Sequence, residues 1–342
     1  MTNVVLDERK LRILSAIIDD YIETAAPIGS RTITRRHDIG VSPATIRNEM
    51  SDLTELGYLE QPHVSAGRVP SGKAYRLYVD RLMAAMEDED PTDEEVSSYF
   101  DEKALQMEDI VKTAVQAVSN LTHLTAVAIL PGQPAMRIAT LQLVPMPGDS
   151  ALLVIVTDSG IVRDTVIHVS RQLDMDALYA ISRMLTENLA GHTLRDVQVM
   201  LDAYAARGGA DQRVLMGVRD LAAQMAKQAS EDSIAMEGAH NILNYPEFSD
   251  LEKARAFLST LEIRDQLISL MCAGEQPISV RIGDELGRPD MADCSVVNAC
   301  FNYGGCRGSL GVIGPMRMPY AQVIRTLYTI SRRMTNLFAE VR

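Results

Sequence analysis

Apolar positions at the start of the chain recur at the spacing of a helix. Between residues 6 and 24 they fall every three or four positions, while charged residues fill most of the positions between them. This spacing predicts an amphipathic first helix that packs against other elements. A turn over residues 25–29 follows, and Ser30 is placed to cap a second, short helix that contains Ile33.

The next apolar stripe predicts the helix on which the functional interpretation depends. Ile46, Met50 and Leu53 recur at spacings of four and three, so they share one buried face. Ser42 is placed to cap this helix, because its hydroxyl can accept a hydrogen bond from the first turn. Gly57 follows the last turn, as glycine often does at a helix C-terminus.

The opposite face of this helix displays small, hydrogen-bonding and cationic side chains. Its candidate DNA contacts are Ser42, Ala44, Thr45, Arg47, Asn48 and Ser51. In a major groove, arginine pairs with guanine, asparagine pairs with adenine, and alanine or the threonine methyl group contacts the thymine methyl group. Ser42, Thr45 and the helix N-terminus can instead bind a phosphate. A solvated surface helix is the alternative interpretation of the same pattern.

A glycine-containing hairpin is predicted directly after this helix. Residues 58–61 have the pattern of a strand, and residues 63–70 have that of a hairpin tip with its return strand. A helix-turn-helix followed by such a hairpin is a winged helix, in which the second helix reads bases while the hairpin contacts the DNA backbone or the minor groove. The candidate contacts in and after the hairpin are His63, Ser65, Gly67, Arg68 and Lys73.

The distribution of charge is compatible with a local DNA-binding surface. The net charge of −13 argues against a general affinity for nucleic acid, but residues 1–86 are neutral and the excess acid lies beyond them. Residues 87–102, which contain no Lys or Arg, are predicted to be an acidic linker. DNA affinity must therefore come from a local basic patch. Its members are Arg31, Arg35, Arg36, Arg47, Arg68 and Lys73, of which the first three face phosphate or, alternatively, form an ordinary solvated face.

Two segments of this region resemble a known family of regulators. VSPATIRNEMSDLTELGYL (residues 41–59) and SAGRVPSGKAYRLYVD (residues 65–80) resemble the DNA-binding domain of the heat-inducible transcription repressors, the HrcA family. The resemblance implies a repressor that binds an inverted repeat in double-stranded DNA upstream of chaperone operons. It also implies that a GroE-type chaperonin keeps the repressor folded. On heating, the chaperonin is occupied, unfolded repressor leaves the DNA, and the chaperone genes are expressed.

Beyond residue 102 the pattern predicts an α+β domain with a helical insertion. Short β-branched or aliphatic runs between turns predict strands, and longer amphipathic runs predict helices. The predicted strands are residues 125–130, 137–143, 151–157, 162–169, 278–282, 294–303 and 308–313, and the predicted helices include residues 172–189 and 319–337. Residues 191–274 are mostly helical in pattern. We therefore assign residues 103–190 and 275–342 to the α+β domain and residues 191–274 to the insertion.

The family resemblance extends into this region. GAHNILNYPEFSD (residues 238–250) and GVIGPMRMPY (residues 311–320) resemble segments of the same repressors, whose C-terminal part is a GAF-like α+β domain interrupted by an inserted dimerising domain. The resemblance thus implies a homodimer. A dimer also suits the expected function, because one winged helix reads too few base pairs to find an operator in a genome. The overall prediction is a multidomain α+β protein with a winged helix-turn-helix at residues 1–86.

The common catalytic and cofactor signatures are missing from the sequence. It has no glycine-rich dinucleotide or phosphate-loop motif, no H-E-x-x-H and no G-x-S-x-G, and its six histidines are scattered. We therefore predict no enzyme activity, no cofactor and no metal site. Cys272, Cys294, Cys300 and Cys306 form no C-x-x-C motif, so free thiols in a reduced compartment are favoured over a zinc or redox site. No apolar run approaches the ~20 residues of a membrane span and no signal peptide is recognised, so we expect a cytoplasmic protein.

Two other functions are alternatives to the repressor. The chain can be a winged-helix regulator of another regulon that responds to a small molecule bound in the α+β domain. It can also be an enzyme whose N-terminal domain serves only for docking, although this requires a catalytic constellation that the sequence does not display. A metabolite that stabilises the protein and alters operator binding would favour the first alternative.

Overall fold

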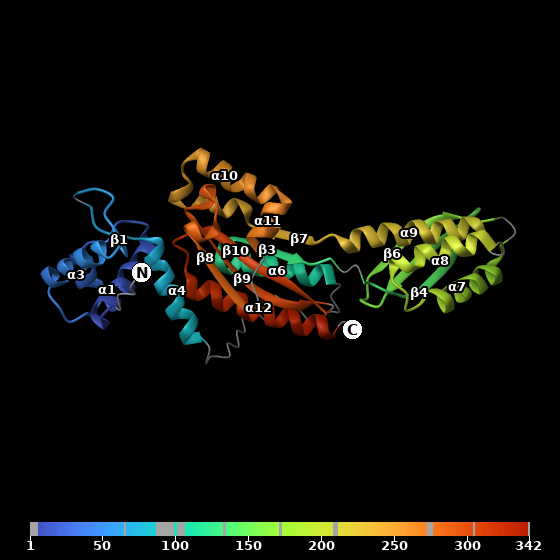
Figure 1. The fold of residues 1–342 in the computed structure, drawn as a ribbon, viewed down its shortest axis with the longest axis horizontal. Coiled ribbons are helices and arrows are strands. Elements are labelled where there is room, and N and C mark those ends of the chain that lie inside the picture. Colours follow the sequence, from blue (N-terminus) through green and yellow to red (C-terminus); the bar gives the residue numbers. More distant parts are fainter. Residues whose placement is uncertain are drawn as a thin grey trace.

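The computed structural model describes residues 6–64, 66–86, 99–100, 107–132, 135–170, 173–207, 211–271, 276–303 and 305–340. Helices and strands are mixed, as the sequence predicted, and three parts follow one another along the long axis of the molecule (Figure 1). We call residues 6–86 the head, residues 107–132 and 231–340 the body, and residues 135–230 the arm.

The head consists of four helices and a two-stranded antiparallel hairpin. Its elements are α1 (Glu8–Thr24), α2 (Ser30–Arg36), α3 (Pro43–Glu55), β1 (Leu59–Glu60), β2 (Val69–Pro70) and α4 (Gly72–Met86). The Ser42 hydroxyl accepts a hydrogen bond from the Thr45 N–H group at the start of α3, so the predicted cap is present. Ile17, Ile33 and Ile46 are fully buried, and the first three helices therefore share one core.

A buried carboxylate joins α1 to the end of α2. Asp20 is 3% exposed, and its Oδ1 atom lies 2.9 Å from Nη1 of Arg36 and 3.1 Å from Nε2 of His37. Arg36 also donates to the exposed carboxylate of Glu23 over 2.6 Å. The charge of Arg36 is therefore engaged within the head.

Replacing Asp20 with alanine is expected to destabilise the head, because Arg36 and His37 lose their buried partner. We expect the free energy of unfolding to fall by about 2 kcal/mol, less than for a fully buried pair, since both partners can become hydrated. The matched control is Glu23→Ala, which removes the exposed partner of the same arginine and should cost less than about 1 kcal/mol. Urea denaturation measures both effects, and equal losses would contradict a structural role for Asp20.

The body is built on a five-stranded antiparallel sheet in the order β7-β3-β10-β9-β8. Helices α6 and α12 cover one face of this sheet, and α10 and α11 cover the other. The helices are α6 (Met107–Thr122), α10 (Leu251–Glu262), α11 (Arg264–Met271) and α12 (Tyr320–Glu340). The strands are β3 (Thr125–Leu130), β7 (Ser233–Glu237), β8 (Ile278–Ile282), β9 (Cys294–Tyr303) and β10 (Cys306–Pro315). The described residues of the body also form the short 3-10 segments η1 (Ala239–Asn244), η2 (Pro246–Phe248), η3 (Gly283–Leu286) and η4 (Pro289–Met291).

Burial on both faces explains the continuous apolar pattern of β3. In β3, Ala126 and Ala128 belong to the core shared with α6 and α12, whereas Val127 and Ile129 belong to the core shared with α10 and α11. Successive side chains of a strand point to opposite faces, so a central strand covered on both sides is mostly apolar along its whole length.

The arm has its own sheet and its own core. β4 (Ile138–Met146), β5 (Ser150–Thr157) and β6 (Val162–His168) form an antiparallel sheet in the order β4-β5-β6 and pair with no other described strand. α7 (Met175–Leu189), α8 (Leu194–Arg207) and α9 (Gln212–Ser230) pack with it around a separate hydrophobic cluster. In Figure 1 the arm lies at the opposite end of the molecule from the head.

The arm is inserted between two neighbouring strands of the body. Strand β3 leads into it and β7 leads out of it, and the two strands pair with Leu130 opposite Ser233. A Cβ atom on Gly132 would lie 2.7 Å from the backbone of Ser230, so the two connections pass in contact with each other. The chain therefore leaves and re-enters the body at one place.

This division differs from the one that the sequence predicted. Residues 191–274 were assigned to the insertion, but β7, α10 and α11 pack in the body, and strands β4 to β6, assigned to the α+β domain, pack in the arm. The physical reason is that a local pattern predicts a strand without specifying its partner. Strand β7 was missed because it is a five-residue edge strand with no fully buried position. The predicted linker, residues 87–102, lies outside the described residues apart from Tyr99 and Phe100.

The described cysteines are free thiols in different surroundings. Burial raises the pKa of the Cys294 thiol to about 12 and also raises the pKa of Cys300, while Cys306 is half-buried.

Because the thiolate is the reactive form, Cys294 should be alkylated by iodoacetamide at about pH 8 roughly 100-fold more slowly than Cys306. Mass spectrometry of the labelled peptides measures the two rates. Equal rates would mean that Cys294 is accessible in solution. Cys272 lies outside the described residues.

Candidate nucleic-acid interface

Helix α3 has one buried and one exposed face. Ile46, Met50 and Leu53 are at most 4% exposed. The candidate contact residues lie on the other side, where Ser42, Ala44, Arg47, Asn48 and Ser51 are exposed and Thr45 is half-buried. The burial pattern is the one that the helical spacing predicted, so the polar and cationic groups are available to a partner.

An ion cluster between α1 and α3 holds this helix in place. Lys10 lies 2.6 Å from Glu49 and 3.0 Å from Asp52, and Arg9 lies 3.5 Å from Glu49. The hydrogen bond to Glu49 is the largest of the causes that raise the pKa of Lys10 above its ordinary value. Glu49 is buried between the two helices, whereas Asp52 and Glu55, towards the C-terminal end of α3, are exposed. The exposed positions of the helix from Ser42 to Ser51 carry no acidic side chain.

The hairpin is anchored to the head through the backbone. The N–H group of Ile28 donates to the carbonyl of Arg68 over 2.9 Å, and the reverse bond is 2.8 Å long. A Cβ atom on Gly67 would lie 2.4 Å from the backbone of Ile28, so this approach requires glycine. The amide of Gln61 donates to the carbonyls of Val64 and Ala66 and closes the tip.

Sequence reasoning identified Gly67 but missed Gln61 and Ile28. A side chain that bonds to the backbone five residues away leaves no periodic signal, and Ile28 is distant in sequence from the hairpin. At the tip, His63 is exposed and Val64 is 98% exposed. Ser65, another predicted contact, lies outside the described residues.

The predicted basic patch separates into engaged and open side chains. Arg68 donates from Nε to the Thr54 hydroxyl over 2.9 Å, and Lys73 donates to the carbonyl of Leu56 over 2.8 Å while its ammonium lies 4.2 Å from the Tyr58 ring centroid. These two cations, like Arg36, therefore also stabilise the head. The open ones are Arg31, Arg35 and Arg47, which are exposed and form no ion pair with a described residue.

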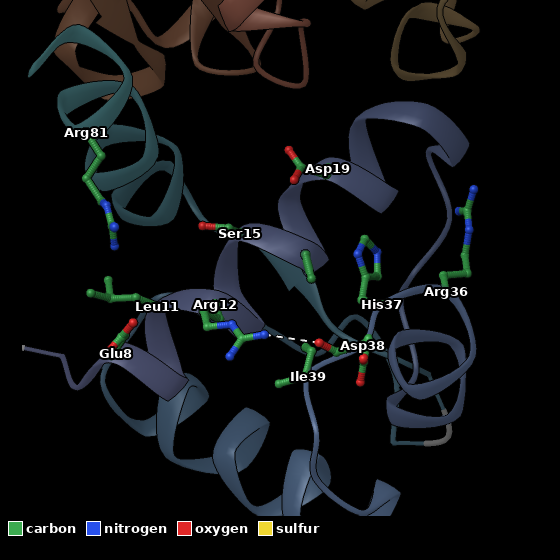
Figure 2. Close-up of a pocket in the computed structure, with 11 residues that line it drawn as sticks. Glu8, Leu11, Arg12, Ser15, Asp19, Arg36, His37, Asp38, Ile39 and Arg81 are labelled. Carbon is green, nitrogen blue, oxygen red and sulfur yellow. Dashed lines mark hydrogen bonds between the residues drawn. The ribbon is translucent and has the colours of Figure 1, made fainter. Parts of the chain in front are cut away.

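A separate cavity of about 480 Å³ lies beside α1 (Figure 2). Its walls are one face of α1, the turn after α2 and Arg81 of α4, and Arg12 donates to the carbonyl of Asp38 across it over 3.0 Å. Carboxylates and guanidinium groups alternate around it, and no residue of α3 or of the hairpin contributes. Since acidic groups repel phosphate, we place this cavity outside the candidate interface.

Comparison with known proteins assigns the family. The sequence profile described as the HrcA protein C terminal domain matches residues 108–324. The heat-inducible transcription repressor HrcA of Pelotomaculum thermopropionicum is 38% identical over 98% of both chains. That of Acetivibrio thermocellus is 37% identical over 96% of this chain and 95% of its own. The chain belongs to the HrcA family.

Membership makes the chain a heat-inducible transcription repressor, which confirms the functional prediction from the sequence. HrcA proteins are transcriptional repressors, a class that is generally not enzymatic. A solved structure described as a hypothetical protein matches 99% of this chain and all of its own, with a TM-score of 0.76 and 26% identity. It supports the mixed α+β architecture over the whole length.

Among the residues that the structure describes, no group of three or more His, Cys, Asp or Glu side chains is arranged to hold a metal ion. No helix in the same residues is both long and apolar enough to span a bilayer.

Proposed function

We propose that this HrcA family member represses chaperone operons by binding an inverted-repeat operator as a homodimer. In this proposal the head is a winged helix, the body is a GAF-like domain and the arm is the dimerising domain. The observation that carries the proposal is the exposed face of α3, which is capped at Ser42 and carries no acidic side chain at its exposed positions up to Ser51.

The geometry of the head suits insertion of α3 into a major groove. Arg47 and Asn48 carry the two side-chain types that pair bidentately with guanine and adenine. Ala44, Thr45 and Ser51 line the same exposed surface with small groups that allow close approach to base edges. Arg31 and Arg35 on α2 are open to bind phosphate, as is the helix N-terminus at Ser42.

The hairpin supplies the second contact in this proposal. Its tip carries the exposed His63 and Val64 and is closed by Gln61. The Arg68 and Lys73 side chains hold the hairpin against the end of α3, and their remaining N–H donors can still face phosphate. The hairpin then contacts the DNA backbone or the minor groove beside the base-reading helix.

The uncovered face of the arm's sheet is our candidate for the dimer contact. Val162 and Val166 on β6 are 52% and 53% exposed, and Val144 on β4 is 44% exposed. Leu152 and Val154 on β5 lie between these strands on the same side of the sheet. The same face also carries two exposed polar residues, Asp164 of β6 and Gln142 of β4, which lie opposite Val154. Its exposed valines are suited to burial against a second copy, and two coupled heads are what recognition of an inverted repeat requires.

We further propose, on the strength of the family resemblance, that a GroE-type chaperonin keeps the dimer active. Folded proteins are marginally stable, and dimer binding adds stability by mass action. A modest loss of folding free energy on heating would therefore remove both dimer and operator binding. Chaperonin occupied by other unfolded proteins could not restore them.

A gel-shift experiment tests the proposal. Purified protein is mixed with the DNA upstream of the chaperone operons of its own organism, with and without chaperonin, before and after heating. We expect a specific complex on the inverted repeat that heat abolishes and chaperonin restores. Equal binding to that fragment and to scrambled DNA of the same length would refute operator recognition.

The alternative of a small-molecule-responsive regulator gains no specific support. One cavity in the body, between α11 and the adjoining ends of β3 and β10, has a volume of about 160 Å³. Pockets for drug-sized ligands are usually about 300–1,000 Å³. The cavity is therefore small for a metabolite, and we do not propose a ligand for it.

A further inference from the structure

The head and the body are joined by two arginines, one from each part. Arg317 lies in the body between β10 and α12, and its Nη1 donates to the backbone carbonyl of Ile22 in the head over 2.9 Å. Arg76 lies on α4 of the head, and its Nη1 donates to the backbone carbonyl of Val280 in the body over 2.8 Å. The contact is thus reciprocal, and we call these two arginines the clasp.

Both carbonyls lie at positions where a regular helix or sheet does not supply a hydrogen-bond donor, namely the end of a helix and the edge of a sheet. Ile22 is in the last turn of α1, where carbonyl groups lack a partner within the helix. The amide of Ala26, which would be its helical donor, bonds to the Thr24 hydroxyl instead. Arg317 therefore caps α1 from another part of the molecule and places a cation at the negative end of its dipole. Val280 is on β8, an edge strand of the body's sheet.

Each arginine of the clasp is also held by a carboxylate of the body. Arg317 is 11% exposed, donates from Nε to Glu247, and lies with its guanidinium 5.3 Å from the centroid of the Tyr245 ring. A planar guanidinium bound on several sides has one orientation, which a lysine could not reproduce. Arg317 can therefore transmit the position of the body to α1.

The Arg76 side of the clasp is fixed in a similar way. Arg76 lies 3.1 Å from the carboxylate of Glu285, whose Oε2 also accepts from the N–H group of Ile282 over 2.9 Å. Nearby, the ring of Tyr75 on α4 lies 5.9 Å from the ring of Tyr320 at the start of α12. These contacts attach α4 to the body at a second place, and two separated attachments resist rotation of the head.

The clasp also brings together the two segments that resemble the family outside the head. Tyr245 and Glu247 belong to residues 238–250, and Arg317 belongs to residues 311–320. They converge on the last turn of α1, at the boundary between head and body seen in Figure 1. Neither segment touches the exposed face of α3, so their place at this boundary calls for a role other than base reading.

We propose that Arg317 and Arg76 are positioning residues that fix the head on the body and thereby set the half-site spacing that the dimer accepts. This inference rests on the proposed operator binding. In a dimer joined through the arms, a rigid head places the second α3 at one distance and one angle from the first. A loosely attached head would reach several spacings, each at a lower effective concentration.

The test compares operators whose half-sites are separated by the natural spacer or by 5 additional base pairs. The insertion turns one half-site to the opposite side of the duplex, so wild-type affinity should fall by about 100-fold. Arg76→Ala combined with Arg317→Ala should bind the natural operator about 10-fold more weakly but differ by less than about 3-fold between the two spacers. Affinity for a single half-site should equal that of the wild type.

Two further variants separate positioning from general damage. Arg288→Ala removes a body arginine that bonds to Asp290 and Gln266 without touching the head, and it should keep the wild-type preference for spacing. Arg317→Lys keeps the charge but cannot hold Ile22 and Glu247 together, so it should fall between the wild type and the double variant. A double variant with the wild-type spacing preference would overturn the proposal.

A measurement without DNA distinguishes failure of the clasp from failure of operator binding. Spin labels on unnatural amino acids at the exposed positions Glu55 of α3 and Leu251 of α10 report the distance between head and body. The distribution should be narrow in the wild type and broad in the double variant. Unchanged distributions would refute the clasp. Broadening in a protein whose wild type binds no inverted repeat would instead refute the proposed function and, with it, the role in spacing.

Discussion

The double substitution Arg47→Ala and Asn48→Ala is expected to abolish operator preference while leaving weak, salt-sensitive binding to DNA. Both side chains are exposed on α3, so their loss removes no core contact. Each bidentate base contact is worth about 1–3 kcal/mol of discrimination, so operator affinity should fall by roughly 100-fold or more. Binding to unrelated DNA depends on phosphate contacts and should change only slightly, since one cation is lost.

Titrations of operator and scrambled DNA at several salt concentrations measure this effect. The matched control is Arg81→Ala, which removes one exposed arginine of the head beside the α1 cavity and away from α3. It should leave the ratio of operator to scrambled affinity unchanged. If the α3 variant lost affinity equally for both kinds of DNA, Arg47 and Asn48 would be phosphate contacts and α3 would not be the reading helix.

Introducing carboxylates on the arm's sheet, by Val162→Glu together with Val166→Glu, is expected to dissociate the dimer. Both valines are more than half exposed on β6, so a glutamate at either position remains hydrated in the monomer. In the proposed dimer the same carboxylates would be buried without partners, which costs several kcal/mol. Affinity for the inverted repeat should fall by about 100-fold or more because the two heads are uncoupled, whereas affinity for one half-site should not change.

Analytical ultracentrifugation measures the change from dimer to monomer. Val199→Glu on α8 is the matched control, because Val199 is 72% exposed on a helix and not on the sheet face. Replacing residues 131–232 with a short turn from Leu130 to Ser233 tests the arm as a whole, since these residues are already paired. A variant of either kind that remains a tight dimer would place the dimer contact in the body.

The elements of the head could be predicted from the sequence because their signals are local. The Ser42 cap, the stripe through Ile46 and Leu53 and the glycine of the hairpin each depend on neighbours within a few residues. Helix periodicity also separates the buried from the exposed face without knowledge of the partner. The candidate interface on α3 was therefore predicted residue by residue before the fold was considered.

The state of the basic side chains could not be predicted in this way. Arg36, Arg68 and Lys73 were assigned to DNA by their charge and position, but each bonds to another element of the head. A cation's partner depends on where distant segments of the chain come to lie. The same limitation applies to Lys10, whose carboxylate partner Glu49 is 39 residues away.

By itself, the sequence determined most of the helices and strands, although not β7, and it determined which face of α3 is polar, since both follow from residue type and spacing. It also contains the segments by which the chain resembles its family. Only the tertiary structure decided that β4 to β6 form a separate arm, that the arm leaves the body between β3 and β7, and that Arg317 and Arg76 attach the head. The pairing of strands and the capping of a helix by a distant side chain depend on complementary surfaces and on backbone groups that lack a hydrogen-bond partner within their own element. These groups come together only when the chain folds. A linear pattern does not contain that information.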